Sequence, residues 1–121
     1  MIAYAVLSND EGQSFSPRIR LSDENNVHDT FLLQRKDGER DAYYLVGIEG
    51  KGFSLFRRKI SRDGKLGPEQ QITSTAVHVE KPHCLRLNSG KIFVTLSKVN
   101  SEAKGISTDI VFMTLFDDAS E

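Results

Sequence analysis

Three observations predict an all-β, antiparallel fold built from a repeated unit. Short runs rich in β-branched and aromatic residues alternate with Gly, Asn, Asp and Ser, which is typical of strands joined by tight turns. Apolar residues do not recur at helical spacing over any long window. The chain also resembles itself at a shift of about 53 residues, a period expected of stacked β units. We therefore treat residues 1–121 as a single all-β domain of repeats.

The strands follow from the alternation of apolar runs and turn signals. The N-terminal run is apolar but has neither a basic leader nor a cleavage site, so we interpret it as the first strand. Each later run is short and ends at a turn, such as Asp37-Gly38 or Asp63-Gly64. The expected strands cover roughly residues 2–8, 16–21, 30–36, 41–48, 53–60, 69–74, 83–88, 91–98 and 108–115.

The repeat rests on several matches that keep the same order along the chain. Ser8 and Asp10 align with Ser61 and Asp63, and a further copy begins at Ile110. That copy ends at Phe116-Asp117-Asp118, where the Ser-x-Asp pattern would start again. The other matches are Arg18–Ser22 with Gln70–Ser74, Phe31–Leu33 with Cys84–Leu87, Asp37-Gly38 with Ser89-Gly90, and Tyr43–Val46 with Ile92–Thr95.

The stretch Ser8–Phe15 reads S-x-D-x-G-x-S-F and resembles the Asp-box, or BNR repeat, of sialidase-like β-propellers. Its Asp and Ser side chains can accept hydrogen bonds from backbone N–H groups of their own turn, and Gly12 supplies a positive φ. We expect Phe15 to pack between neighbouring sheets. The resemblance implies about two blades in a permuted order. The chain would begin with strands three and four of one blade, continue with a full four-stranded blade over residues 30–74, and end with strands one to three of the next blade over residues 83–115.

Two blades cannot close a propeller ring, because known propellers use four or more. An open fragment would expose unpaired edges and a large apolar flank. We expect a homo-oligomer in which copies complete the fold, since the chain begins with Met and ends in a polar tail, Asp117–Glu121. A piece of a longer protein and a self-closing β-sandwich or barrel are the alternatives.

Composition narrows the class of function. The formal net charge of −1, from 16 basic and 17 acidic residues, argues against a nucleic-acid or anionic-membrane partner. No apolar run is long enough to span a bilayer, and no glycine-rich phosphate loop indicates a cofactor. The single cysteine, Cys84, excludes an internal disulfide and favours a cytoplasmic location, and its apolar strand predicts a buried, inert thiol.

Candidate site residues come from the segments that would enter the first strand of each blade, at the propeller rim. The middle of the chain also resembles five-bladed glycoside hydrolases that act on furanosides, which use an Asp base and a Glu acid in an E-x-P context. That resemblance implies Asp29 and Glu80 as weak catalytic candidates, although Pro is absent after Asp29 and Lys81 replaces a small residue. The predicted ligand-binding residues are Asn26, His28, Asp29, Tyr44, Glu80 and His83, with Tyr43 as another aromatic for sugar stacking.

Two other constellations fail on spacing. The sialidase resemblance would require a cluster of arginines. Arg57 and Arg58 are adjacent on one strand, so their side chains point to opposite faces. We expect these two arginines, and also Arg18 and Arg20, to be surface residues of strands. His78, Glu80 and His83 form H-x-E-x-x-H, yet Pro82 excludes the helix that would align them. We predict no metal site.

The predicted function is therefore a non-catalytic binding or assembly module that recognises a glycan. A glycoside hydrolase, sialidase-like or furanosidase-like, or a fragment of one, is the alternative. The absence of Trp leaves an oligomeric β protein without a small ligand as a third possibility.

Overall fold

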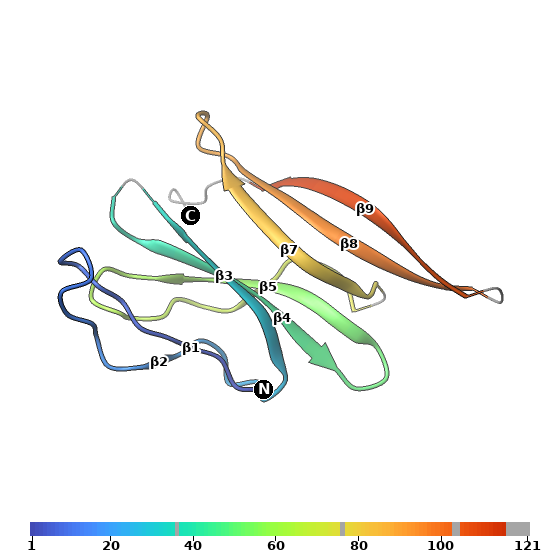
Figure 1. The fold of residues 1–121 in the computed structure, drawn as a ribbon, viewed down its shortest axis with the longest axis horizontal. Helices are drawn as coiled ribbons and strands as arrows, with labels where there is room; N and C mark the ends of the chain where they lie inside the picture. The colour runs from blue at the N-terminus through green and yellow to red at the C-terminus, as the bar shows by residue number, and fades with distance from the viewer. Residues whose placement is uncertain (36, 76, 103–104, 116–121) are drawn as a thin grey trace.

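The computed structural model describes residues 1–35, 37–75, 77–102 and 105–115, which form three antiparallel sheets (Figure 1). The strand orders are β1-β2, β3-β4-β5-β6 and β7-β8-β9. No membrane-spanning helix occurs in these ranges. The strands are β1 (Tyr4–Ala5), β2 (Ile19–Arg20), β3 (Val27–Gln34), β4 (Arg40–Ile48), β5 (Gly52–Ile60), β6 (Gln70–Gln71), β7 (Val79–Arg86), β8 (Ile92–Glu102) and β9 (Gly105–Leu115).

The four-stranded sheet lies between the other two and is covered on both faces (Figure 1). Successive side chains of a strand point to opposite faces, so β4 contributes to two cores. Tyr44 and Val46 join a core with the N-terminal segment, and Tyr43 and Leu45 join a core with β7 and β8. The first core contains Ala3, Ala5, Leu7, Leu21, Val27, Ala42, Tyr44, Val46 and Ile60, and the second contains Tyr43, Leu45, Leu55, Val79, Cys84, Ile92, Val94 and Leu96.

The internal repeat appears in the strand pairing. Gln34 pairs with Arg40 as Arg86 pairs with Ile92, a shift of 52 residues. The turns that link these strands are also alike, because Arg35 N donates to Glu39 O at 2.7 Å and Leu87 N donates to Lys91 O at 2.8 Å. With this shift, Tyr43 in the first repeat corresponds to Thr95 in the second. The predicted match of Tyr43 with Ile92 is therefore wrong by three residues.

The nine strands arise where the sequence predicts them, but several differ in extent, and β1, β2 and β6 are only two residues long. β3 begins at Val27 and β7 at Val79, earlier than predicted, because each strand contains a bulge that the alternation pattern does not reveal. β8 extends to Glu102 and β9 begins at Gly105, so the last hairpin is longer than predicted. The third repeat start at 116–118 and the tail Asp117–Glu121 lie outside the described residues.

The loop at 8–15 is held by its own side chains. Asp10 accepts a hydrogen bond from Ser14 N at 2.9 Å and another from the Ser14 hydroxyl. The Ser8 hydroxyl donates to Asp10 at 2.8 Å and accepts from Gly12 N at 2.8 Å. Phe15 does not pack between sheets as predicted, because its side chain is 62% exposed. The loop is therefore ordered by hydrogen bonds and not by an aromatic anchor.

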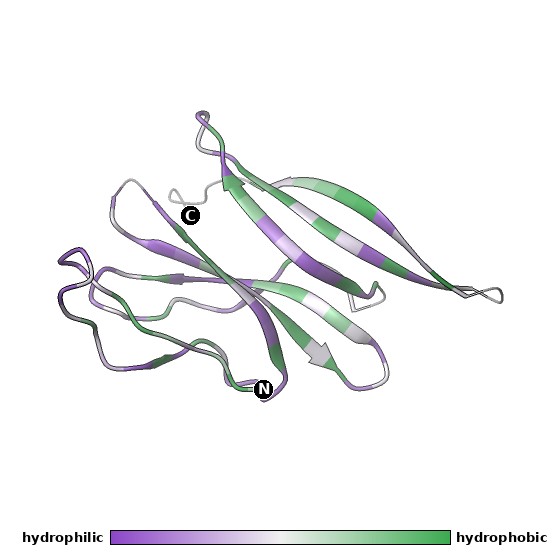
Figure 2. Cartoon of the chain, viewed as in Figure 1, coloured by the Kyte–Doolittle hydropathy of each residue, from purple (hydrophilic) through white to green (hydrophobic). Residues whose placement is uncertain are grey.

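Both ends of the stack present apolar side chains to solvent. On β7–β9 the side chains that point away from the second core include Leu85, Ile110 and Phe112, all well exposed. In the N-terminal segment, Ile2, Tyr4 and Val6 alternate with the buried Ala3, Ala5 and Leu7. Figure 2 shows hydrophobic residues along β8 and β9. Each outer sheet thus exposes one apolar face, whereas both apolar faces of the central sheet are buried.

Replacing Leu55 by Ala tests the second core. Leu55 is fully buried between the central sheet and β7–β9. Loss of its side chain leaves a cavity, so we expect the free energy of unfolding to fall by about 3 kcal/mol in urea denaturation. The matched change Leu32→Ala, at a largely exposed side chain of β3, should cost about 1 kcal/mol or less. Equal costs at the two positions would contradict the described packing.

The loop at 8–15 predicts a dependence of stability on pH. Hydrogen bonds from the Ser14 hydroxyl, the Ser14 N–H and the Ser8 hydroxyl lower the pKa of Asp10 from 3.8 to about 2. A pKa lowered by folding stabilises the protein above the unfolded value, and this contribution disappears as the pH falls through the folded pKa. We expect Asp10→Asn to weaken the decline in unfolding free energy between about pH 4 and pH 2. Identical pH profiles for the parent and the variant would refute this, and Asp23→Asn is the control.

Candidate functional site

Two edge strands, β3 and β7, lie side by side and carry the same irregularity. In β3 the pairing passes from His28 with Leu45 to Phe31 with Tyr43, and so contains one extra residue. In β7 it passes from Glu80 with Ser97 to His83 with Thr95 in the same way. A bulge at this position re-aims the residues around it and interrupts an otherwise open sheet edge. The chain therefore places two equivalent bulges beside each other.

Each bulge holds a non-glycine residue in the left-handed region. Asp29 has φ 50° and Lys81 has φ 53°. Asp visits this region more readily than most residues, whereas for Lys it costs roughly 1 kcal/mol or more. Such conformations persist only where the surroundings impose them, and they cluster at ligand sites. The matched pair is therefore the feature from which a site is best built.

The two bulges border a hollow of about 300 Å³. The side chains of Asp29, Lys81 and His83 are exposed, and none of the three makes a hydrogen bond or ion pair with another described residue. They offer a carboxylate acceptor, an ammonium donor and an imidazole within one small surface. The lining residues are Asp29, Thr30, Phe31, Lys81, Pro82 and His83.

Three other predicted residues, Asn26, His28 and Glu80, belong to a row of contacts formed by the residues that precede the bulges. His28 Nε2 lies 2.6 Å from Asn26 Oδ1, and the His28 ring meets Phe53 edge-on with centroids 5.0 Å apart. Phe53 N donates to His78 Nδ1 at 2.7 Å, and His78 Nε2 lies 3.1 Å from Glu80 Oε1. Because Nδ1 accepts, the ring proton of a neutral His78 is on Nε2, where it can donate to Glu80. His78 thus holds the Glu80 carboxylate.

The two carboxylates proposed as a catalytic pair are in different surroundings. Asp29 borders the hollow between the bulges, whereas Glu80 is not among the residues that line it and is bonded to His78. Glycoside hydrolysis needs two carboxyl groups that flank one bond. The arrangement brings Asp29 and His83 together and leaves Glu80 with Asn26 and His28 in the adjacent row.

Tyr44 is fully buried in the first core and does not reach either group. Its hydroxyl donates to Glu69, which also accepts from the Ser22 hydroxyl at 2.7 Å. Burial, followed by the bond to Glu69, raises the pKa of this phenol. Tyr43 is buried in the second core, where burial raises its pKa to about 12. Neither ring is placed to stack on a ligand, because β4 is covered on both faces.

The arginines do not converge. Arg57 donates to Gln70 Oε1 at 2.9 Å and to the Tyr43 hydroxyl, while Arg58 donates to Leu21 O and Gly67 O. Their opposite orientation is as predicted, but Arg57 is buried and is not the surface residue expected. Arg18 stacks on the Tyr4 ring at 4.4 Å, and Arg20 donates to Ser22 O at 2.8 Å.

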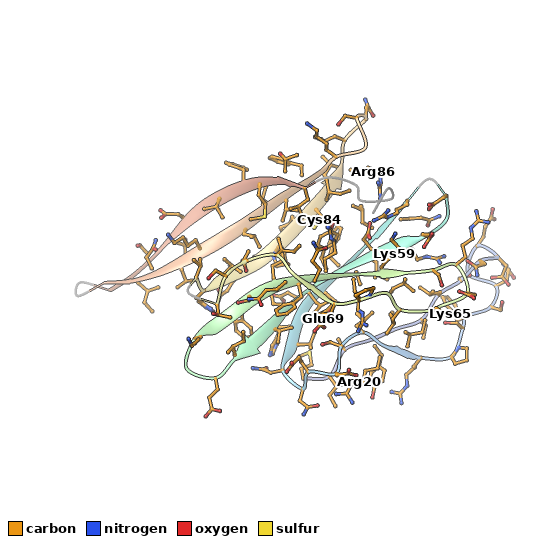
Figure 3. The ribbon with its side chains drawn as sticks, turned by 180° about the vertical axis from the view of Figure 1, so that it is seen from behind. Arg20, Lys59, Lys65, Glu69, Cys84 and Arg86 are labelled. Carbon is orange, nitrogen blue, oxygen red and sulfur yellow. The ribbon has the colours of Figure 1, made fainter. Side chains whose placement is uncertain are left out.

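Cys84 and the histidines show no metal-binding geometry in the described part of the chain. No group of three or more His, Cys, Asp or Glu side chains gathers there. Cys84 lies in the second core, where burial raises its pKa to about 12. Figure 3 labels Cys84 and Glu69, which lie on opposite sides of the central sheet. A buried thiol with a raised pKa is a poor nucleophile and a poor ligand.

Comparisons with known proteins identify the arrangement of the sheets. No family model matches the sequence, and no curated protein matches it. The structure is similar to that of an α-L-arabinanase from Penicillium chrysogenum, solved in complex with arabinobiose, with a TM-score of 0.71 and 16% sequence identity. The match covers 93% of this chain and 36% of that enzyme, a β-propeller. The three sheets are therefore stacked as propeller blades, and the chain spans about a third of that structure.

Thr30, Phe31, Lys81 and Pro82 line the hollow but were not among the predicted residues. Lys81 belongs to the segment predicted at the rim, but it was not predicted to bind a ligand. The available signal was the shift of 52 residues, which aligns Val27 with Val79 and hence Asp29 with Lys81. The positive φ of Lys81 has no signature in residue type, because lysine is rare in that conformation, whereas aspartate is enriched there.

Proposed function

We propose that this chain is a non-catalytic module that binds a carbohydrate in the hollow between the bulges of β3 and β7. The observation that supports this most directly is the pair of equivalent bulges, which present polar groups without a partner among the described residues on a shared surface. Asp29 would accept from sugar hydroxyls, while Lys81 and His83 would donate to ring or hydroxyl oxygens. Phe31 and the buried Pro82 supply the apolar wall that a sugar face requires.

Binding is favoured over hydrolysis by the surroundings of the carboxylates. Glu80 is held by His78 and is not among the residues that line the hollow that Asp29 borders, whereas glycoside hydrolysis needs an acid and a base on either side of one bond. The alternative, a furanosidase-like glycoside hydrolase or a fragment of one, is supported by the similarity of fold to an arabinanase. A sialidase-like activity has less support, since the arginines lie apart.

We propose further that the apolar ends of the stack are covered by other copies of the chain. The central sheet buries both faces, and the exposed ends carry the same kind of residues on one face each. The outer face of β7–β9 would contact the outer face of the N-terminal segment in the next copy. Such a head-to-tail contact can repeat until a ring closes.

Titration with arabinobiose, followed by calorimetry and by amide resonances, tests the proposed ligand. We expect Asp29→Asn to weaken binding about tenfold, because it removes a charge-assisted hydrogen bond and Asn tolerates the same φ. The matched control is Glu39→Gln, in the turn at the opposite end of β3. Maltose, a pyranose disaccharide, reports whether the hollow discriminates between sugars. No saturable binding of either sugar at millimolar concentration would contradict a carbohydrate ligand.

The same samples separate binding from hydrolysis. If the chain acts as a binding module, Glu80→Gln should leave affinity within about twofold, and neither protein should release arabinose from arabinobiose. Turnover by the parent protein that Glu80→Gln abolishes would establish the hydrolase alternative. Product release can be followed by chromatography.

Light scattering of the purified chain tests the assembly. We expect a defined multiple of the 13.6 kDa chain mass. Phe112→Ser removes a large apolar side chain from the outer face of β9, where it is 65% exposed, and should reduce the mass to that of one chain without loss of the far-ultraviolet β signal. A parent protein that remains a stable monomer at high concentration would overturn this proposal.

A further inference from the structure

A second polar hollow lies at the other end of the sheets, away from the bulges. It has a volume of about 550 Å³. Three turns meet there, which are the loop at 8–14, the hairpin at 35–39 and the turn at 61–65, all toward the left of Figure 1. The turn that contains Lys65 is labelled in Figure 3. The residues that matter for its chemistry are Asn9, Glu11, Gln34, Gly38, Arg40 and Arg62.

Arg40 is the first residue of β4 and is 9% exposed. One of its terminal nitrogens, Nη2, donates to Asn9 Oδ1 at 3.1 Å and to Ser8 O at 3.3 Å. The other, Nη1, is buried and has no acceptor among the described residues. A buried guanidinium donor without an acceptor carries the cost of its lost hydration, and native proteins contain few such groups. This nitrogen therefore points to an interaction that the described residues do not supply.

Arg62 approaches the same hollow from the turn between β5 and β6. Its guanidinium lies over Gly38, where an added Cβ would be only 2.3 Å from Nε. Gly38 also has φ +86°, so its lack of a side chain serves both the turn and the close approach of Arg62. Arg62 is exposed and makes no hydrogen bond or ion pair with any described residue. Its donors are thus available at the surface of the hollow.

The residues that line the hollow carry a net positive charge, because Arg40 and Arg62 outnumber Glu11. Glu11 is the only acidic residue that lines it in the described structure, and no ion pair joins Glu11 to Arg40 or Arg62. Two guanidinium groups can hold the oxygens of a carboxylate or phosphate through paired N–H donors. The side-chain amide of Gln34 adds further donors at the wall.

We propose that this hollow is a binding site for a small oxyanion, a carboxylate or phosphate group held between Arg40 and Arg62. The site is formed by turns at the opposite end of β4 from the 48–52 turn, and it shares no lining residue with the hollow between the bulges. It is therefore independent of the proposed carbohydrate site.

Amide and Arg Nε resonances followed during titration with sodium phosphate or sodium acetate test the site, at constant ionic strength maintained with sodium chloride. We expect saturable shifts at Asn9, Gly38 and Arg62 with at least one of the two anions, and the anion that acts identifies the phosphate or the carboxylate class. Arg62→Gln should weaken the binding at least tenfold, and Arg62→Lys should restore only part of it, since lysine keeps the charge but not the paired donors.

The control is Lys51→Gln, which removes one positive charge from an exposed position in the 48–52 turn and should leave the affinity unchanged. Arg62 is exposed, so its variants should retain the thermal midpoint of the parent protein. Arg40→Lys, a buried change, is measured as a second variant and should also weaken binding. Shifts that do not saturate, or that are the same in Arg62→Gln and in Lys51→Gln, would show that the hollow has no specific anion site.

Discussion

The burial of β4 on both faces is the constraint on which the rest of the structure depends. Its alternating side chains enter two separate cores, so the central sheet is stable only with a sheet on each side. The N-terminal segment supplies one cover with alanines and leucines, and β7–β9 supplies the other with Val79, Ile92, Val94 and Leu96. The same requirement, applied to the outer sheets, leaves each with one uncovered apolar face. Stacking of this kind has no internal stop, which is why propeller blades continue until a ring closes.

Stacking also determines where polar groups can gather. The edge strands β3 and β7 come together because their sheets are neighbours, and each is interrupted by a bulge at the equivalent position. Asp29 and Lys81 are bulge residues that do not pair with the neighbouring strand. Both can therefore face the shared hollow without the loss of a strand pairing. At the opposite end, the turns of the first two sheets converge around Arg40 and Arg62. Both hollows are therefore products of the contact between neighbouring sheets, one at their edges and one at their turns.

Local patterns account for where the structure places some of the predicted residues and not for where it places others. Asp29 and His83 were predicted because they enter first strands, and the structure places both on one hollow. Tyr44 was predicted as a stacking aromatic, yet it lies in a core, since alternation shows which residues share a face but not whether that face is covered. Glu80 directly precedes the bulge in β7, is bonded to His78 and does not line the hollow that Asp29 borders. Arg57 was expected at the surface, because alternation does not show that its face is covered. It is buried and bonded to Tyr43 and Gln70.

The sequence by itself determined the all-β class, the order of nine strands, the turns at 35–39, 61–65 and 87–91, and the repeat, because these depend on local alternation and on residues such as Gly38 that allow positive φ. Only the tertiary structure decided the exact shift of 52 residues, the two bulges and the two faces of β4 that are buried. It also decided that Arg40, from the start of a strand, lines the same hollow as Arg62, from a later turn. These features depend on contacts between residues far apart in the chain, and such contacts leave no periodic signal in either partner.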